Sequence, residues 1–300
     1  MSSLVSFQGV TKEFKRSQGF RRERVLALDD VSFSVNPGEF VGLIGHNGAG
    51  KSTSIKLIMG FIRQNRGQVL VRERLPSDVE TRRSLGYVPE NSSFSDFLTG
   101  WEILDAFGKI SDLSKHDRKL RGQQLLESLD IAHAGHRLVK TYSKGMTQRL
   151  AIAQALMGRP DVLILDEPMT GLDPLGRRQV LEVLLEELKR GVSLVFCSHL
   201  LADVQQLCER VLWLHQGRVR FDGALRDLVE DRAHYELTYR GPSAIDGAES
   251  MGREFYRVRL QPEDLQATLS LVETIGGRVE SFQPATRALE EIFVADIVKQ

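Results

Sequence analysis

The sequence predicts an α/β fold with a mostly parallel sheet as its core, followed by a small α+β domain, and three observations predict it. Apolar runs such as residues 40–45 and 162–168 end in glycine-rich or acidic clusters, as strands buried on both faces of a parallel sheet do. Helical periodicity alternates with these runs. After residue 230 the pattern changes to alternation of apolar and polar residues. We therefore expect one domain over residues 1–230 and another over 231–300.

The elements of the first domain follow from local patterns. Leu150, Ile152, Ala153 and Leu156 have the spacing of an amphipathic helix, and Gly191 is a plausible C-cap for another. Buried strands are expected at 40–45, 162–168 and 193–199, helices at 53–62, 149–158 and 177–191, and a hairpin around Gln216-Gly217.

The second domain shows a different order of elements. Strands are expected at 234–240 and 254–260, separated by a loop-rich stretch at 241–252. A helix at 262–277 then opens with a proline and closes on two glycines. A short strand at 278–282 and a final helix from 288 complete a β-β-α-β-α unit.

Composition excludes several classes of protein. The 40 Lys and Arg residues balance 40 Asp and Glu residues, so no strong field favours a nucleic-acid partner. No apolar run approaches the ~18–20 residues of a membrane span, and the N-terminus lacks the pattern of a signal peptide. Cys197 and Cys208 have no metal or redox spacing. We expect a cytoplasmic protein with reduced thiols, which reaches a membrane only through a partner.

A phosphate-binding loop is the strongest motif. The stretch "GHNGAGKST" fits the pattern G-x-x-x-x-G-K-[ST] between an expected strand and an expected helix. Backbone N–H groups of such a loop wrap a phosphate, Lys51 reaches the β- and γ-phosphates of ATP, and Ser52 offers its hydroxyl to Mg2+. The expected ATP-binding residues are Gly45, His46, Asn47, Gly48, Ala49, Gly50, Lys51, Ser52 and Thr53.

Two acids at the end of the strand at 162–168 supply the rest of this chemistry. Asp166 is expected to hold the Mg2+ shell, as the strand-end carboxylate of phosphate-loop NTPases does. Glu167 is expected to orient and deprotonate the attacking water. Elsewhere a strand ending in Asp-Glu is usually a solvated turn, but beside a phosphate loop the catalytic interpretation is favoured.

Five motifs in order give the chain its resemblance to a family. The phosphate loop, "YSKGM", "LILDEP", "GLDP" and "CSH" follow one another as in ATP-binding subunits of ABC transporters, over Leu4 to about Glu230. The resemblance implies a P-loop NTPase cassette with a helical signature subdomain at about 90–160. It also implies two cassettes meeting head-to-tail. The signature residues Ser143, Lys144, Gly145 and Met146 would then face the ATP of the other copy, where a helix N-terminus suits a γ-phosphate.

The resemblance implies further roles. Asp173 would lie at the dimer interface, and His199 would contact the γ-phosphate as a catalytic switch residue. An aromatic ring near the N-terminus would stack on adenine. Phe14 matches that position, and Phe20 is a rival because the basic stretch at 15–24 looks like an insertion in the usual turn, a solvated loop.

The chain departs from the family pattern at three places. Tyr142, Lys144 and Met146 replace the commonest signature residues. Glu90 stands where the family has a glutamine; it could ligate Mg2+ or position water, or it could act in coupling. The domain after 230 is extra. Together these departures resemble bacterial exporters whose membrane subunits are separate polypeptides.

The segment after Glu90 is expected to receive that membrane permease. Phe94, Phe97, Leu98 and Trp101 are more apolar than a surface loop needs, although each could equally belong to a local core. The expected partners are therefore a second cassette, most simply a homodimer, and a permease that holds the chain on the inner face of the cell membrane. Two alternatives remain open: a soluble ABC ATPase of translation or repair, and a regulatory cassette without useful turnover.

Overall fold

The structure is a computed structural model that describes residues 3–18, 21–198, 201–286, 289 and 292. The chain divides into two compact units, Met1–Gly223 and Ala224–Gln300, which are described separately. The boundary expected at about Glu230 falls inside the second unit, at the first residue of a strand, and the observed division comes earlier, after Gly223. No described helix is both long and apolar enough to cross a bilayer.

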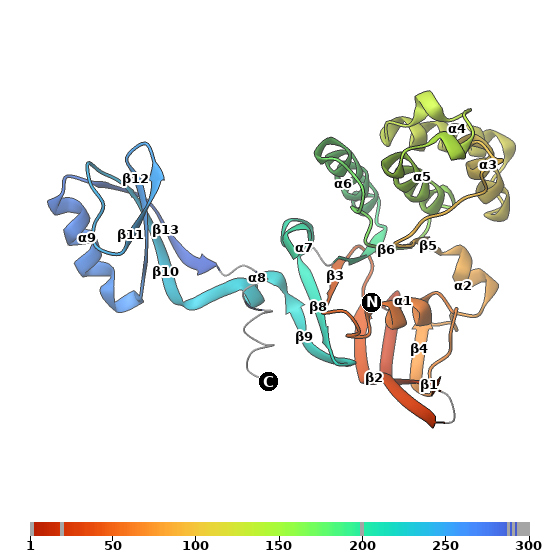
Figure 1. The fold of residues 1–300 in the computed structure, drawn as a ribbon, viewed down its shortest axis with the longest axis horizontal. Helices are drawn as coiled ribbons and strands as arrows, with labels where there is room; N and C mark the ends of the chain where they lie inside the picture. The colour runs from red at the N-terminus through yellow and green to blue at the C-terminus, as the bar shows by residue number, and fades with distance from the viewer. Residues whose placement is uncertain (1–2, 19–20, 199–200, 287–288, 290–291, 293–300) are drawn as a thin grey trace. The chain divides into compact units, whose positions relative to one another are not determined.

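A six-stranded sheet forms the core of the first unit (Figure 1). Its strand order is β5-β6-β7-β3-β8-β9, and the pairs from β5 to β8 are all parallel. The strands are β3 (Phe40–Ile44), β5 (Leu85–Val88), β6 (Val162–Asp166), β7 (Ser193–Cys197), β8 (Arg210–His215) and β9 (Arg218–Ala224). Every residue of β3 and β7 is buried, which explains their unbroken apolar sequences. The predicted α/β class is confirmed.

The predicted hairpin is also confirmed at the edge of this sheet. Gln216 and Gly217 join β8 to β9 and both have positive φ, 47° and 78°. Two such residues form the turn type that matches the twist of paired strands. Local turn chemistry was therefore enough to place this element.

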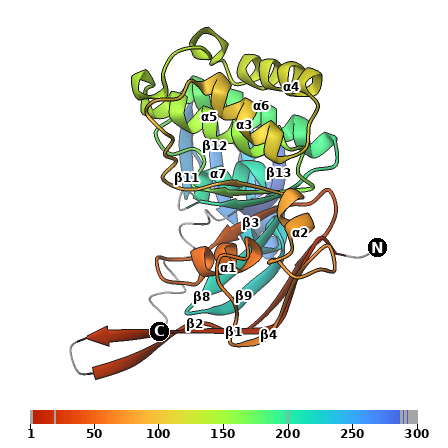
Figure 2. The same cartoon turned by 90° about the vertical axis from the view of Figure 1, so that its right-hand side faces the viewer.

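A second, antiparallel sheet carries the N-terminus, in the order β2-β1-β4. Its strands are β1 (Val5–Gln18), β2 (Arg21–Val35) and β4 (Arg66–Val71). The expectation of a solvated loop at 15–24 is wrong, because the backbone there pairs Lys15 with Arg24 and Gln18 with Arg21. The pair extends as a long ribbon beyond the sheet (Figure 2). The stretch is rich in charged residues and lacks the apolar alternation of a strand, so the sequence pattern did not reveal the pairing.

Helices next to the sheets are α1 (Lys51–Ile58), α2 (Val79–Arg83), α6 (Pro174–Lys189) and α7 (Leu201–Leu207). The start of α6 is fixed because the Asp173 carboxylate accepts a hydrogen bond from the Gly176 N–H at 2.8 Å. Its end is fixed by Gly191, whose φ of 93° makes it the expected glycine cap.

A helical subdomain consists of α3 (Gly100–Ile110), α4 (Lys115–Ser128) and α5 (Lys144–Met157), with short 3-10 turns η1 (Ala132–Ala134) and η2 (Val139–Thr141). These helices gather at one end of the first unit (Figure 1). The expectation of an amphipathic α5 is wrong, because Leu150 to Ala153 and Ala155 to Met157 are all buried. The helix contacts both α3 and α4, so little of it faces solvent.

The second unit is a four-stranded antiparallel sheet with one described helix of more than a turn or two. The sheet order is β11-β12-β10-β13. Its elements are α8 (Leu225–Val229), β10 (Glu230–Arg240), β11 (Ala248–Gly252), β12 (Phe255–Leu260), the 3-10 turn η3 (Pro262–Asp264), α9 (Leu265–Thr274) and β13 (Arg278–Thr286). Its core centres on Tyr239, which is buried and whose hydroxyl accepts a hydrogen bond from the Ile245 N–H at 2.7 Å.

The predicted β-β-α-β-α order is therefore incomplete. The stretch expected as a loop at 241–252 contains the edge strand β11, which pairs with β12. Most of β11 is exposed, so it lacks the alternation that marks a half-buried strand. Most of the final helix expected from residue 288 lies outside the described residues; Leu289 and Ile292 are helical.

Candidate nucleotide site

The phosphate loop connects β3 to α1, as predicted, and depends on its glycines. Gly45, Gly48 and Gly50 have φ of 151°, 86° and 110°. A Cβ at Gly50 would lie 2.6 Å from Leu28 and 2.8 Å from the Ala27 carbonyl oxygen, so a larger residue cannot fit. Gly50 also caps α1 without any side-chain hydrogen bond. The first N–H groups of α1 thus remain able to bind an anion.

Lys51 lies across the loop. Its ammonium donates hydrogen bonds to the carbonyl oxygens of Gly45 at 2.5 Å and His46 at 3.2 Å. The residue is buried, with 9% of its surface exposed. A buried cation held at the mouth of a helix N-terminus is suited to bind phosphate oxygens.

Asp166 and Glu167 lie at the carboxyl end of the sheet, at the same edge as the loop. The register pairs Cys197 with both Asp166 and Leu43, which brings the ends of β6, β7 and β3 together. Glu167 has a positive φ of 52°, and its N–H donates to the Cys197 carbonyl oxygen at 2.8 Å. Such backbone strain is often found at functional residues, where the surrounding structure maintains it.

The acids at this edge influence one another. Burial, followed by the charges of Glu167 and Glu90, raises the pKa of Asp166, although a hydrogen bond from Cys197 and the charge of Lys51 oppose the shift. Burial and the charges of Asp166, Cys197 and Glu90 raise the pKa of Tyr87 to about 12. The charges of Lys51, Glu90 and Glu167 all act on Asp166, so we treat these four residues as one candidate site.

The donor set of this site fits Mg2+. Within the described residues, no group of three His, Cys, Asp or Glu could hold a metal ion. Magnesium in phosphoryl-transfer sites is usually held by one or two carboxylates together with substrate phosphates and waters. The Ser52 hydroxyl, the Asp166 carboxylate and the Glu90 carboxylate provide oxygen donors of the kind that Mg2+ prefers.

The signature segment begins α5. The Ser143 hydroxyl accepts a hydrogen bond from the Met146 N–H at 3.2 Å, and both Ser143 and Lys144 are exposed. A Cβ at Gly145 would approach the Gly171 carbonyl oxygen to 3.2 Å. Buried Gln148 donates to the Pro168 carbonyl oxygen at 3.2 Å. The start of α5 is therefore attached to the segment between Glu167 and α6.

Another set of residues is predicted to contact adenine, the γ-phosphate or the dimer partner. Phe14 lies on β1 with 38% of its surface exposed, and the Lys12 ammonium is 5.0 Å from its ring centroid. Asp173 is exposed at the start of α6. Among described residues, the hydrogen bonds of the signature side chains do not reach the phosphate loop. Phe20 and His199 lie outside the described residues.

The segment expected to receive a permease contains both exposed and packed side chains. Phe97 is 84% exposed and Leu98 38%, whereas Trp101 is partly buried. A groove of about 570 Å3 lies between α2 and β5 on one side and α3 and α5 on the other, and Pro89, just before this segment, lines it. Val79 and Ile110 line it with 65% and 67% of their surfaces exposed. Sequence patterns did not single out these two residues, because each looks ordinary within its own short helix.

Phe94 belongs to the same segment and is half-buried, so it fits the local-core alternative better than Phe97 does.

Cys197 was also missed as a component of the site. Its thiol donates a hydrogen bond to Asp166, and burial raises its pKa well above the usual range. Its position in a buried strand next to the histidine motif was the available signal.

Comparisons with known proteins agree with this geometry. The ABC transporter family profile matches residues 28–170. An ABC transporter ATP-binding protein of Synechocystis sp. is 35% identical over 294 residues, covering 94% of this chain and 81% of that protein. The Nod factor export ATP-binding protein I of Burkholderia thailandensis is 31% identical over 300 residues, covering 97% and 95%.

Solved structures give the same result. An ATP-binding subunit of an ABC transporter superposes with a TM-score of 0.68 at 32% identity, covering 75% of this chain and 92% of that one. The cassette MJ0796, solved as a dimer in a post-hydrolysis state with ADP and Pi, superposes with a TM-score of 0.66 at 26% identity. The match covers 74% of this chain and 99% of that one. The chain belongs to the ATP-binding proteins of ABC transporters. It is an ATP-hydrolysing transporter subunit with a P-loop NTPase fold.

Proposed function

We propose that this chain hydrolyses ATP between two head-to-tail copies and thereby drives a separate membrane permease, most simply an exporter. One observation carries the proposal: the strained Glu167 follows Asp166 at the sheet edge where the phosphate loop also begins. The similarity to a Nod factor export protein supports the export direction. The chain would then work in the cytoplasm, on the inner face of the cell membrane.

In this proposal the chain's own residues divide the work of hydrolysis. The N–H groups at Gly45, His46, Asn47, Gly48, Ala49, Gly50, Ser52 and Thr53 bind the phosphates. Lys51 neutralises charge on the β- and γ-phosphates. Glu167 is the general base that takes a proton from the attacking water, and His199 contacts the γ-phosphate. Phe14 stacks on the adenine.

Magnesium completes the site when ATP is bound. Ser52 and Asp166 would hold it, and Glu90 would act directly or through a water. Bound Mg2+ supplies charge neutralisation between the phosphates. Because burial and neighbouring charges raise the pKa of Asp166, a cation at this edge would stabilise its ionised form.

The second copy would complete the nucleotide site. Ser143, Lys144, Gly145 and Met146 lie at the start of α5, where a γ-phosphate of the partner's ATP can meet N–H groups and a small hydroxyl. Asp173 would lie at the same interface. The packing of Gly145 against Gly171 supports this role, because it joins the start of α5 to the segment that follows Glu167. The related cassette MJ0796 is itself dimeric in its solved structures, which supports pairing of two copies here.

The permease would dock where the apolar groove meets the segment after Glu90. Val79 and Ile110 line the groove with exposed apolar side chains, and Phe97 adds an exposed apolar side chain in the segment after Glu90. Single exposed apolar residues are common, but a groove lined by several marks a surface suited to a helix of a partner. Pro89 lines the groove, and the charge of the next residue, Glu90, acts on Asp166, so Glu90 would couple the docking face to the nucleotide site.

Paired variants test the catalytic part. Lys51→Ala is expected to abolish ATP hydrolysis and weaken nucleotide binding. Glu167→Gln is expected to keep ATP affinity and lose ~10²–10⁴-fold in kcat. Steady-state ATPase rates and equilibrium ATP binding separate the two effects. An unchanged kcat in Glu167→Gln would show that another group activates the water, and near-normal turnover in Lys51→Ala would refute the phosphate-loop assignment.

A further inference from the structure

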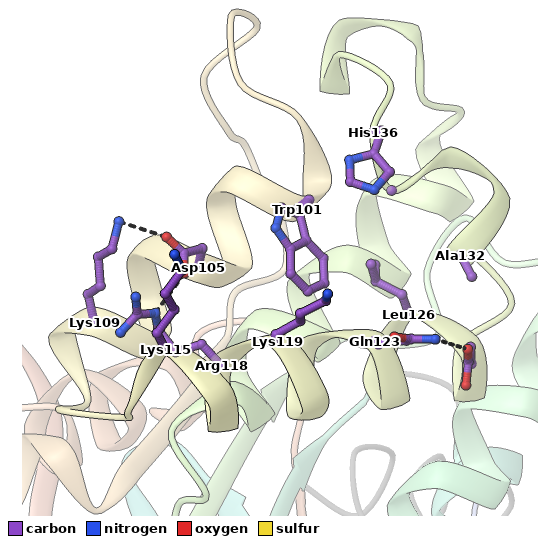
Figure 3. Close-up of a pocket in the computed structure, with 12 residues that line it drawn as sticks. Trp101, Asp105, Lys109, Lys115, Arg118, Lys119, Gln123, Leu126, Ala132 and His136 are labelled. Carbon is purple, nitrogen blue, oxygen red and sulfur yellow. Dashed lines mark hydrogen bonds and ion pairs between the residues drawn. The ribbon is translucent and has the colours of Figure 1, made fainter.

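The helical subdomain carries a second pocket, remote in sequence from the phosphate loop, that the ATPase chemistry does not use. It lies between α3, α4 and the turn η1 and has a volume of about 880 Å3 (Figure 3). Pockets of roughly 300–1,000 Å3 are typical of small-molecule sites. Its lining combines one aromatic wall with an unusual density of cationic side chains.

Trp101 forms the aromatic wall and is held in place. Trp101 lies at the start of α3, and its backbone N–H donates a hydrogen bond to the Gly135 carbonyl oxygen at 2.8 Å. Its ring lies over α4 at Gly122, where a Cβ would be only 3.1 Å from the indole. The His136 ring centroid is 6.0 Å away. The indole is partly exposed to the pocket, so it offers a fixed flat surface to a ligand.

The charges around this wall do not balance. Four cations and two carboxylates line the pocket, in a chain whose formal net charge is zero. Asp105 is shared, because it accepts from Lys109 at 2.7 Å and from Arg118 at 2.6 Å. The other carboxylate, Glu127, is a hydrogen-bond acceptor for Gln123. The pocket therefore has an excess of two positive charges.

Two lysines provide that excess. Lys115 and Lys119 are exposed on α4, and within the described part of the chain neither has a hydrogen bond or ion pair. They are four residues apart, so they lie on one face of the helix. Figure 3 shows the Lys119 ammonium directed toward the indole of Trp101. Like charges at this spacing are destabilising unless an anion neutralises them.

We propose that this pocket binds a phosphate ester. Its phosphate group lies on the ammonium groups of Lys115 and Lys119, and its organic part rests on Trp101. Lysine ammonium groups are common ligands of phosphate, and an aromatic face accepts a planar or apolar group. The ester is either a diffusible molecule or the headgroup of an anionic phospholipid, and the same chemistry recognises both.

The two tryptophans of the chain allow a direct test. Trp213 is buried in β8, so Trp213→Phe leaves Trp101 as the only reporter. Emission of this variant is titrated with AMP, with glycerol 3-phosphate, and with vesicles of phosphatidylglycerol in phosphatidylcholine. Pure phosphatidylcholine vesicles are the blank. The same titrations are repeated with Lys115→Gln/Lys119→Gln and with Lys140→Gln, an exposed lysine of η2 outside the pocket.

A change in Trp101 emission with a soluble phosphate identifies a diffusible ester, and a change with anionic vesicles alone identifies a headgroup. In either case the double variant is expected to bind the probe at least about tenfold more weakly than the parent, whereas Lys140→Gln is expected to bind it with unchanged affinity. ATPase activity and unliganded Trp101 emission are expected to be the same in all three proteins. No response to any probe, or equal binding by the double variant, overturns the proposal.

Discussion

Replacing Glu187 by glutamine is expected to destabilise the first unit more than any neighbouring surface change. Arg121 on α4 donates to Glu187 on α6 at 2.8 Å, and only 8% and 6% of these side chains are exposed. This ion pair joins the helical subdomain to a helix beside the sheet. Arg190 also contacts Glu187, at 2.7 Å, but it is 56% exposed and can turn to solvent. Arg121 cannot.

The size of the effect follows from that burial. Removing one partner of a buried pair costs about 3–5 kcal/mol, because the other charge stays buried without compensation. Glutamine keeps an acceptor oxygen for Arg121, so we expect the lower end, about 3 kcal/mol. The other hydrogen bond of Arg121, to the Leu156 carbonyl oxygen, is long at 3.4 Å, and its Nε has no partner among the described residues.

Urea unfolding of the Trp213→Phe chain, followed by Trp101 emission, measures this loss in the helical subdomain. With a slope of about 3 kcal/mol per M, the midpoint should fall by about 1 M. Glu186→Gln is the matched control, since Glu186 is 61% exposed and pairs with Arg190 at 3.7 Å. Its effect should stay below about 0.5 kcal/mol. Equal midpoints for the two variants would refute the argument that burial makes this pair matter.

Two further predictions concern the site and its docking face. Asp166→Asn should raise the free energy of unfolding at pH 7, because burial and the charges of Glu167 and Glu90 raise the folded-state pKa of Asp166. The folded protein holds that proton more tightly, so wild-type stability falls as pH rises through the raised pKa. The gain should vanish below the unfolded value of about 3.9, and a gain that persists there would contradict this cause. Phe97→Asp should leave folding and basal ATPase activity unchanged but reduce the membrane-bound fraction of the chain in cells about tenfold. Leu271 is 52% exposed on α9, and the control variant Leu271→Asp should leave the membrane-bound fraction unchanged. Equal fractions would exclude Phe97 from the docking face.

The fold of the first unit was predictable where local chemistry decides it. The buried runs in β3, β6 and β7 and the turn at Gln216-Gly217 each carry their own signal. The strands at 15–24 and the edge strand β11 carry no such signal, because the first stretch is rich in charged residues and most of β11 is exposed. Pairing with neighbouring strands defines both. The amphipathic interpretation of α5 failed for a related reason, since contacts with α3 and α4 bury most of its surface.

The candidate site divides in the same way. Lys51, Asp166 and Glu167 stand in motifs whose chemistry requires their order, and the structure brings them to one sheet edge. The contributions of Cys197 and Tyr87 depend on distances across strands, which no single segment of sequence contains. The same holds for Trp101. The sequence groups Trp101 with Phe97 in the segment expected to receive the permease. In the structure its ring packs at Gly122 of α4, where the absence of a side chain leaves room for it, and it lines the basic pocket.

The start of α5 gives the central proposal its most direct test. If Ser143 binds the partner's nucleotide, Ser143→Arg should spare ATP binding by the dilute chain and block dimer closure, because arginine is too large for that contact. In a Glu167→Gln background, light scattering with ATP should show the mass of two 33.7 kDa chains, and the added Ser143→Arg should return it to one. If Ser143 only caps its own helix, the variant should lose ~1 kcal/mol of stability and still dimerise, and that result would contradict the head-to-tail account.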